Sequence, residues 1–557
     1  MNKIRRKQQK DFDRQRPTSP TSFQQQQQQQ QVPIEHNPSI AKSPPLQQQD
    51  FVSPPSSSST SPPIPAHPNT LPPSHSIANG ASPNINIINL GKPVNLSKPV
   101  QKVPESPPFE DQLSDYKRLQ RERYLKQKQE AVVKTFVQTS SVGNIHLSKL
   151  SGGNSHSGVL TPPLIKVKMN NHHYREVNFT SKDGCLWIND VNFKLKGINW
   201  FGCETETSVV HGLWSRDYKQ YLDFLQANHF NAIRIPFCLE MILKDPIPTS
   251  ISITTHMNSD LHGLRALSVL DIIIEAAGER GIFILLDLHS FGPNDRLHDG
   301  LWYNSAHTEQ ETLKAWNILI LRYGRTWNVM GVDLKNEPYS ATWDSGNPLT
   351  DWDKAINRIG SFIQTNGGNR WLIFGQGVPS QQSSSLPCCW GESFESEGRQ
   401  SDTKPLTTIH LPIEDKFVYS PHCYGPSVVN HNHFRHSSFP DNMMPHWDAN
   451  FGMLPQTTRR AVVIGEWGGK YAENLDRLWM TSFVKYLQNR GCTDSFYWCL
   501  NPNSGDTGGL LKDDWVSINQ DKLDLLHKLC PHPTKVRYDK DLSQFIITSA
   551  TQSHSEA

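Results

Sequence analysis

Eight short β-rich runs alternate with longer helical stretches from residue 184 onward, and this alternation constrains the fold more than any other feature. The segments between the runs, such as DYKQYLDFLQANH and LSVLDIIIEAAGERG, have helical periodicity, and the second ends at the stop signal Gly281. Eight βα units in series predict an α/β fold, a closed (β/α)8 TIM barrel. The expected strands are residues 195–199, 231–235, 283–289, 331–336, 371–377, 417–422, 462–466 and 496–500.

The segment GCLWINDVNFKLKG, residues 184–197, precedes the first helix and resembles a short hairpin. Asn189 and Asp190 stand at its centre, and both residue types favour tight turns. We expect this hairpin to close the floor of the barrel.

Composition changes sharply near residue 165, and this change sets the domain boundaries. Residues 1–165 hold 22 of the 40 prolines and a run of eight glutamines, so they cannot bury enough apolar surface to fold. We therefore predict a long disordered N-terminal tail over 1–165, a catalytic barrel over 166–545 and a flexible C-terminus over 546–557.

Charge divides at the same place and bears on partners. The tail has 19 basic and 10 acidic residues, whereas the remainder has 36 basic and 43 acidic residues. An acidic folded domain argues against nucleic acid as the main partner. The start, MNKIRRKQQKDFDRQR, lacks the apolar core of a signal peptide, and no apolar run is long enough to span a bilayer. We expect a cytoplasmic monomer that uses no membrane.

Polar residues gather where the predicted strands end, which is where TIM barrels carry their chemistry. Any one of these residues alone has a structural explanation, such as an ion pair or a buried histidine. Together they bring two carboxylates, two histidines and several hydrogen-bonding groups to one rim. They are Arg234, His289, Asn336, Glu337, His422, Tyr424, Glu466 and Trp498.

This set fits glycoside hydrolysis, because cleaving an acetal needs a protonated acid at the leaving oxygen and a carboxylate below the anomeric carbon. Asn336 beside the acid is placed to bind a sugar hydroxyl. Arg234 and Tyr424 are expected to hold Glu466 ionised, while His289 and His422 shape the surrounding network. The acid is then Glu337 and the nucleophile Glu466.

Residues 184–516 resemble the endoglucanases, or cellulases, of glycoside hydrolase family 5. Asn-Glu-Pro at 336–338 and Gly-Glu-Trp-Gly at 465–468 match the acid/base and nucleophile motifs of that family. The segments VVHGLWSRDY, LWYN, NMMPHW and NPNSGDTGGLLKDDW resemble its bacterial endoglucanase branch. The resemblance implies the same roles for the remaining rim residues and a β-glucan polysaccharide or oligosaccharide as substrate. By the same analogy the protein could be extracellular.

Tryptophans near the strand ends are the candidate sugar platforms. We assign substrate binding to Trp214, Trp302, Trp447 and Trp498, with Trp200 and Trp343 also close to the rim. The acidic pairs Asp513-Asp514 and Asp351/Asp353 are weak metal candidates, so we expect neither a metal nor a cofactor.

The sequence favours a retaining endo-1,4-β-glucanase that works by double displacement. A β-mannanase or another β-glycosidase on the same barrel remains open, because substrate choice depends on loops. A non-catalytic carbohydrate-binding scaffold is a third reading, and the presence of both glutamates and all the supporting residues argues against it.

Overall fold

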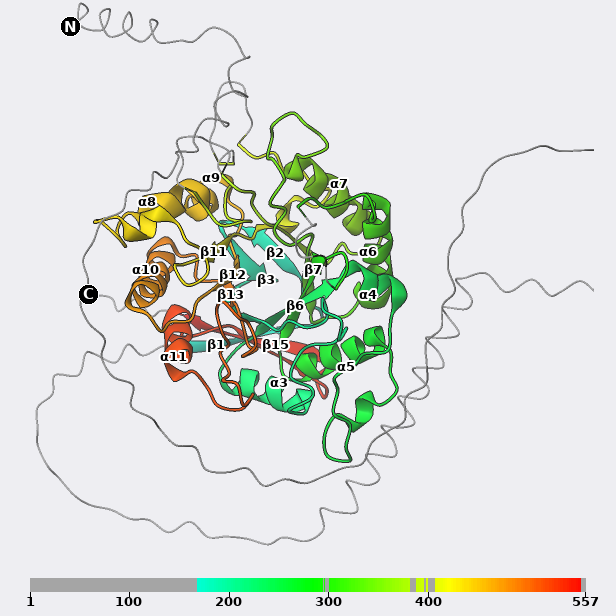
Figure 1. The fold of residues 1–557 in the computed structure, drawn as a ribbon. Helices are drawn as coiled ribbons and strands as arrows, with labels where there is room; N and C mark the ends of the chain where they lie inside the picture. Colours follow the sequence, from blue (N-terminus) through cyan, green and yellow to red (C-terminus); the bar gives the residue numbers. More distant parts are fainter. Residues whose placement is uncertain are drawn as a thin grey trace, which may run out of the picture. The chain divides into compact units, whose positions relative to one another are not determined.

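The computed structural model describes residues 168–551 except 294, 296–299, 381–386, 395–396 and 399–405 (Figure 1). The predicted tail, 1–165, lies outside the described residues. Within the described part, strands occupy the centre and helices surround them.

The central element is a nine-stranded parallel sheet that curls into the predicted (β/α)8 barrel. Each of the eight predicted runs contains or overlaps a strand of this sheet, so the barrel is confirmed. In sheet order the strands are β10 (Phe417–Tyr419), β9 (Leu372–Gly375), β8 (Val329–Asp333), β7 (Phe283–Ser290), β6 (Ala232–Cys238), β5 (Lys196–Asn199), β13 (Ser495–Tyr497), β12 (Ile464–Gly468) and β11 (His422–Tyr424).

The sixth predicted strand is broken in two at Ser420-Pro421, giving β10 and β11. Proline has no amide hydrogen to donate, so the ladder changes partner there. Upstream, β10 pairs with β9, and downstream β11 pairs with β12. A parallel bridge between Tyr419 and Val462 joins the two ends and closes the barrel.

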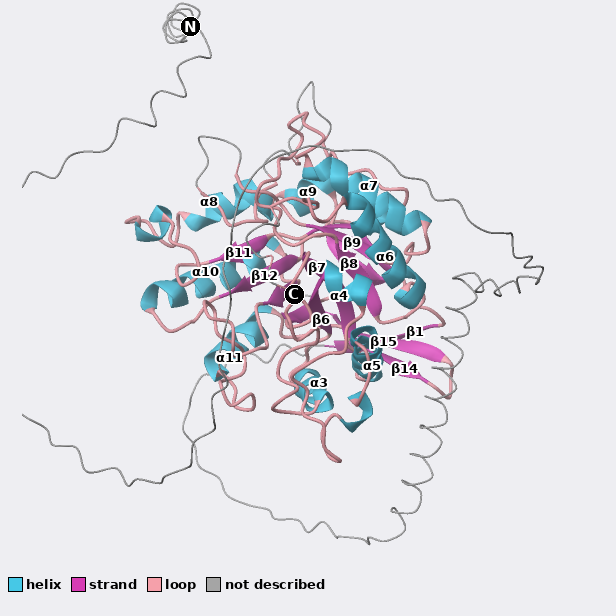
Figure 2. Ribbon diagram, turned by 45° about the vertical axis from the view of Figure 1, so that its right-hand side comes forward, coloured by secondary structure: helices cyan, strands magenta, loops and turns pink. Residues whose placement is uncertain are grey.

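Helices cover the outside of the barrel (Figure 2). Sequence signals fix several of their ends: Asp217 caps the first helix, Thr308 and Glu311 form a capping box, and Gly491 ends α10 with a left-handed φ. The helices are α3 (Tyr218–Ala227), α4 (Leu239–Lys244), α5 (Ala266–Glu279), α6 (Glu309–Tyr323), α7 (Trp352–Thr365), α8 (Met443–Trp447), α9 (Leu454–Thr458), α10 (Asn474–Arg490) and α11 (Gln520–Leu529). Short 3-10 turns lie at Ser259–Leu261, Glu414–Lys416 and Asn432–Arg435, and a π-turn lies at Asp448–Gly452.

The predicted hairpin is present and is part of a three-stranded sheet with β2 (Phe179–Lys182), β3 (Cys185–Ile188) and β4 (Val191–Asn192). Its side chains Leu186 and Ile188 belong to one buried cluster with Phe283 and Leu285 of β7. The hairpin therefore closes the end of the barrel where the strands begin, as expected. A second cluster fills the layer between strands and helices.

The C-terminal boundary at 545 was wrong. β1 (Lys168–Tyr174), β15 (Gln544–Thr551) and β14 (Lys535–Asp539) form a separate antiparallel sheet, so the fold continues to Thr551. The consecutive apolar residues Phe545, Ile546 and Ile547 are all buried, and Phe545 and Ile547 pack into the floor cluster. Residues 552–557 lie outside the described part.

Among the described helices, none combines the length and apolar character needed to cross a lipid bilayer. All nine cysteines, including Cys388 and Cys389, are free thiols.

The contact between the barrel and the C-terminal sheet can be tested at Gly281. Its φ is +71°, and a Cβ there would lie 2.0 Å from the Val536 carbonyl oxygen. Gly263 has φ +70° with nothing within 4 Å of a Cβ, which makes it a matched control. Both alanine variants bear the left-handed strain, but Gly281→Ala should lose a further ~1–3 kcal/mol of unfolding free energy from the clash. Urea unfolding measures both. Equal losses would show that β14 does not press on this turn.

Candidate active site

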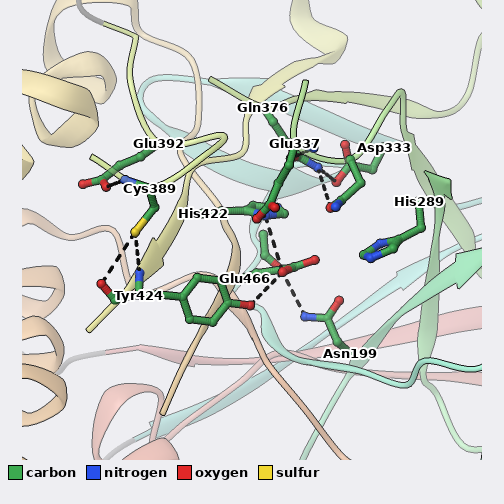
Figure 3. A network of polar contacts seen from close by, with 12 residues as sticks. Asn199, His289, Asp333, Glu337, Gln376, Cys389, Glu392, His422, Tyr424 and Glu466 are labelled. Carbon is green, nitrogen blue, oxygen red and sulfur yellow. Dashed lines mark hydrogen bonds and ion pairs between the residues drawn. The ribbon is translucent and has the colours of Figure 1, made fainter. Parts of the chain in front are cut away.

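The predicted catalytic side chains converge at the end of the barrel where the strands finish (Figure 3). Glu466 lies within β12, and Glu337 follows β8 by four residues. Glu466 is 4% exposed, whereas the Glu337 side chain is 21% exposed. A carboxylate oxygen of each glutamate and a ring nitrogen of His422 all lie within 4.8 Å of one another. The two carboxylates therefore face the same small space.

Arg234 of β6 lies at the centre of the site and is fully buried. Its guanidinium donates to Glu466 Oε1 at 2.7 Å and to Asn336 Oδ1 at 3.1 Å. It also lies 3.0 Å from both Asp287 Oδ1 and Asp333 Oδ2. Burial opposes its charge, but the three carboxylates outweigh that effect and raise the pKa of Arg234 above its ordinary value. The predicted support of Glu466 by Arg234 is therefore present as a direct ion pair.

Glu466 has a second donor on its other oxygen. The Tyr424 hydroxyl donates to Glu466 Oε2 at 2.7 Å, and burial keeps the pKa of this tyrosine well above its usual range. Tyr424 therefore stays a neutral donor at physiological pH. A guanidinium and a hydroxyl therefore donate one hydrogen bond to each oxygen of Glu466 and fix the plane of its carboxyl group.

Glu337 has a different environment. Its amide N–H donates to Gln376 Oε1 at 2.7 Å, and its Oε1 lies 3.0 Å from His422 Nδ1. Burial raises the pKa of Glu337 to about 7, against the opposing charges of Arg234 and Lys335. This carboxyl can therefore carry a proton near neutral pH and release it, as a general acid must.

His422 lies between the two glutamates. Burial lowers its pKa to about 4, so the imidazole is neutral at pH 7. Its Nδ1 lies 3.0 Å from Glu337 and 3.5 Å from Glu466, whereas Nε2 has no hydrogen-bond partner among the residues that the structure describes. The neutral ring with the proton on Nδ1 is the form that can donate to Glu337.

Two aspartates in the barrel interior were missed by the sequence analysis. Asp287 of β7 and Asp333 of β8 are both fully buried beside Arg234, and burial raises the pKa of each to about 6. Asp287 Oδ2 also lies 2.7 Å from His289 Nδ1. Both were readable as carboxylates inside otherwise apolar strands, where an acid needs a buried partner.

Two amides complete the network and were also missed. Asn199 of β5 accepts from Arg234 at 3.0 Å and donates to the carbonyl of Gly465, the residue before Glu466. Gln376, the residue after β9, donates to Asp333 at 3.0 Å. With these residues, the polar groups of the site come from seven strands or strand ends of the barrel: β5, β6, β7, β8, β9, β11 and β12.

The four predicted tryptophan platforms divide into two groups. Trp498 is half-buried and stacks between His289 and Phe201, and Trp214 is 37% exposed. Trp302 and Trp447 are each 1% exposed, which contradicts their assignment to substrate binding. Both belong to the layer between strands and helices, where Trp302 packs on Trp352. Proximity to a strand end in sequence did not indicate which way these rings face. Trp200 and Trp343, at 0% and 2% exposed, are buried in the same layer.

Aromatic rings form two further groups, each of which contains one exposed tryptophan. Phe201 stacks on Trp498, His211 packs against Phe201, and Trp214 packs against His211. A second group, which the sequence analysis missed, pairs Tyr339 with Trp390, whose ring centroids lie 4.6 Å apart. Trp390 is 50% exposed and comes from the long segment after β9.

Glu337, His422 and Glu466 also have the spacing of a metal-binding group. We assign no metal to them, because the Arg234 guanidinium 2.7 Å from Glu466 would repel a cation there. The expectation that neither metal nor cofactor is needed stays a prediction, and the acidic pairs near residues 351 and 513 are not part of this group.

Comparison with known proteins agrees with this geometry. The cellulase family, glycosyl hydrolase family 5, matches residues 191–504. The major extracellular endoglucanase of Xanthomonas campestris pv. campestris is 40% identical over 339 residues, covering 60% of this chain and 67% of that protein. An endoglucanase of Paenibacillus polymyxa is 37% identical, covering 60% and 82%.

Among solved structures, a hyperthermophilic endocellulase from the archaeon Pyrococcus horikoshii superimposes with a TM-score of 0.59 at 36% identity, covering 64% of this chain and all of that one. The family match leaves β1, β14 and β15 outside its limits. The chain belongs to glycosyl hydrolase family 5, the cellulase family, and is a glycoside hydrolase.

Proposed function

We propose that this protein is a retaining endo-1,4-β-glucanase, with Glu466 as nucleophile and Glu337 as acid/base. The observation that carries the proposal is the closeness of the two carboxylates, whose oxygens lie within 4.8 Å. Retaining enzymes hold their carboxyl groups ~5–5.5 Å apart, whereas inverting enzymes need ~6.5–9.5 Å to admit a water molecule. The names of the similar proteins support the choice of a glucan.

In the first step, Glu466 attacks the anomeric carbon while Glu337 gives its proton to the leaving glycosidic oxygen. The pKa of Glu337, about 7, suits this role because the acid must be protonated when the bond breaks. Glu466, with donors on both oxygens, is held as a carboxylate ready to attack. In the second step, Glu337 takes a proton from water, which then displaces Glu466 from the sugar.

Aromatic rings next to residues of the site support binding of a sugar chain. Trp498 stacks on His289, and Tyr339, two residues after Glu337, pairs with the exposed Trp390. Pyranose rings present apolar faces that pack on such surfaces.

Stereochemistry tests the mechanism directly. Proton NMR of the first product released from a soluble cello-oligosaccharide should show the β-anomer, followed by slow mutarotation. Early appearance of the α-anomer would mean that a water attacks in place of Glu466.

Substrate class is tested by release of reducing ends from carboxymethylcellulose and from mannan, using the full chain. We expect release from carboxymethylcellulose and little from mannan. The reverse preference would favour the β-mannanase alternative, and no release from either would favour a non-catalytic scaffold.

The tryptophan assignments are separable by kinetics and stability. Trp498→Ala removes a half-buried ring that we propose binds sugar, so KM for cello-oligosaccharides should rise while the melting temperature changes little. Trp447→Phe, at a buried site, should lower the melting temperature by several degrees and leave KM unchanged. A rise in KM for the second variant would restore Trp447 to the substrate site.

Alanine substitution of Glu337 and of Glu466 should affect activity in different ways. Glu337→Ala lacks the proton donor, so kcat/KM on natural glucan should fall by roughly 10²–10⁴-fold or more. An aryl cellobioside with a good leaving group should still glycosylate the enzyme. Azide should then speed turnover by attacking the intermediate. Glu466→Ala lacks the attacking group, so activity on both substrates should be lost together. If Glu466→Ala were instead the variant active on aryl cellobiosides, the roles would be reversed.

A further inference from the structure

The backbone at Glu337 has an unusual conformation. Its φ is +40°, in the left-handed region that residues with a side chain seldom adopt. Such a conformation persists only when neighbouring groups hold it in place. The peptide unit between Asn336 and Glu337 sets the direction of the acid/base side chain, so the groups that bind this peptide are the relevant ones.

Both polar ends of that peptide unit are held by side chains. The amide N–H of Glu337 donates to Gln376 Oε1 at 2.7 Å. The carbonyl oxygen of Asn336 accepts from Lys335 Nζ at 2.7 Å. The same ammonium donates to the His289 carbonyl oxygen at 3.2 Å, which ties the end of β8 to the end of β7. The peptide plane is therefore fixed from two sides.

Lys335 is an unusual residue for this place. It is 1% exposed, and its ammonium lies 5.6 Å from the centre of the Phe291 ring. Burying an ammonium is costly unless it is hydrogen-bonded and near opposite charge. Its charge acts on two carboxyls of the site, because it lowers the pKa of both Glu337 and Asp287 against the effect of burial.

We propose that Lys335 is a positioning residue for the reaction: its buried ammonium clamps the Asn336–Glu337 peptide opposite Gln376 and places a fixed positive charge beside the acid/base. This proposal rests on the proposed role of Glu337. Two effects follow from one side chain. The hydrogen bonds to carbonyl oxygens aim Glu337 at the leaving group, and the charge limits how far burial raises its pKa.

The experiment uses Lys335→Met, which removes charge and donor, and Lys335→Gln, which removes the charge but keeps a donor. The readout is the alkaline limb of kcat/KM on a soluble cello-oligosaccharide, because activity falls there as Glu337 loses its proton. Loss of a nearby positive charge destabilises the carboxylate, so the limb should move to higher pH by about one unit in both variants. Other groups act on Glu337 and remain unchanged: Arg234, Asp287, Asp506, His422, Tyr424 and Glu466.

The rates should separate the clamp from the charge. At the pH optimum, Lys335→Met should lose roughly tenfold or more in kcat/KM on the cello-oligosaccharide, because a misplaced acid transfers its proton poorly. Lys335→Gln should lose less. On an aryl cellobioside with a good leaving group, kcat/KM of both variants should stay close to that of the unmodified protein. Such a leaving group departs without taking up a proton.

Lys416→Met is the matched control. Lys416 is also buried, at 3% exposed, and donates to Asn178 Oδ1 at 2.7 Å and to backbone carbonyls, but at the floor of the barrel. Its variant should melt at a lower temperature with an unmoved alkaline limb. The proposal is overturned if the alkaline limb stays in place in both Lys335 variants while kcat/KM on both substrates falls by the same factor. Should Lys335→Met not fold, Lys335→Gln alone decides. Failure of the underlying role of Glu337 would appear separately, as equal loss on both substrates in Glu337→Ala.

Discussion

A single buried guanidinium holds the active site together. Arg234 contacts Asp287, Asp333 and Glu466, which come from three different strands, and has no exposed surface. Charges of opposite sign in a water-free interior are stable only as a complete set, because removing one partner leaves the others uncompensated. The position of Glu466 therefore depends on the register of β6, β7, β8 and β12 at once. A change that shifts one of these strands will move Glu466.

The same set gives two chemically identical side chains very different surroundings. Glu466 accepts from a guanidinium and a hydroxyl, whereas Glu337 faces a neutral imidazole and lies in surroundings that raise its pKa to about 7. Environment sets the two roles apart, as in other glycosidases with paired carboxylates. His422 suits its place between them because burial keeps it uncharged. A protonated imidazole there would favour the ionised form of the acid.

The sequence predicted the barrel, and the place where Glu337 and Glu466 meet, because both depend on local patterns. Eight β-rich runs, separated by amphipathic segments, leave few folds open, and rim residues follow from strand ends. The break at Pro421 was readable only in hindsight, because a proline near the end of a run does not show which strand pairs on each side. Asp287, Asp333 and Gln376 were missed because their roles depend on hydrogen-bond and ion-pair partners far along the chain. The assignment of Trp302 and Trp447 to substrate binding was wrong because nearness to a strand end does not give the direction of a side chain.

The interior of the barrel has two layers, and the order of residues along single strands creates them. In β7, Phe283 and Leu285 join the apolar floor cluster, while Asp287, two residues further, faces Arg234. In β6, Ala232 and then Arg234 repeat this order. Because side chains alternate along a strand, the apolar residues and the charged ones point into the same interior at successive heights. The charged layer therefore rests on a close-packed base that cannot shift without opening a cavity. The hairpin and the C-terminal sheet, which seal that base, support carboxylates that they never touch.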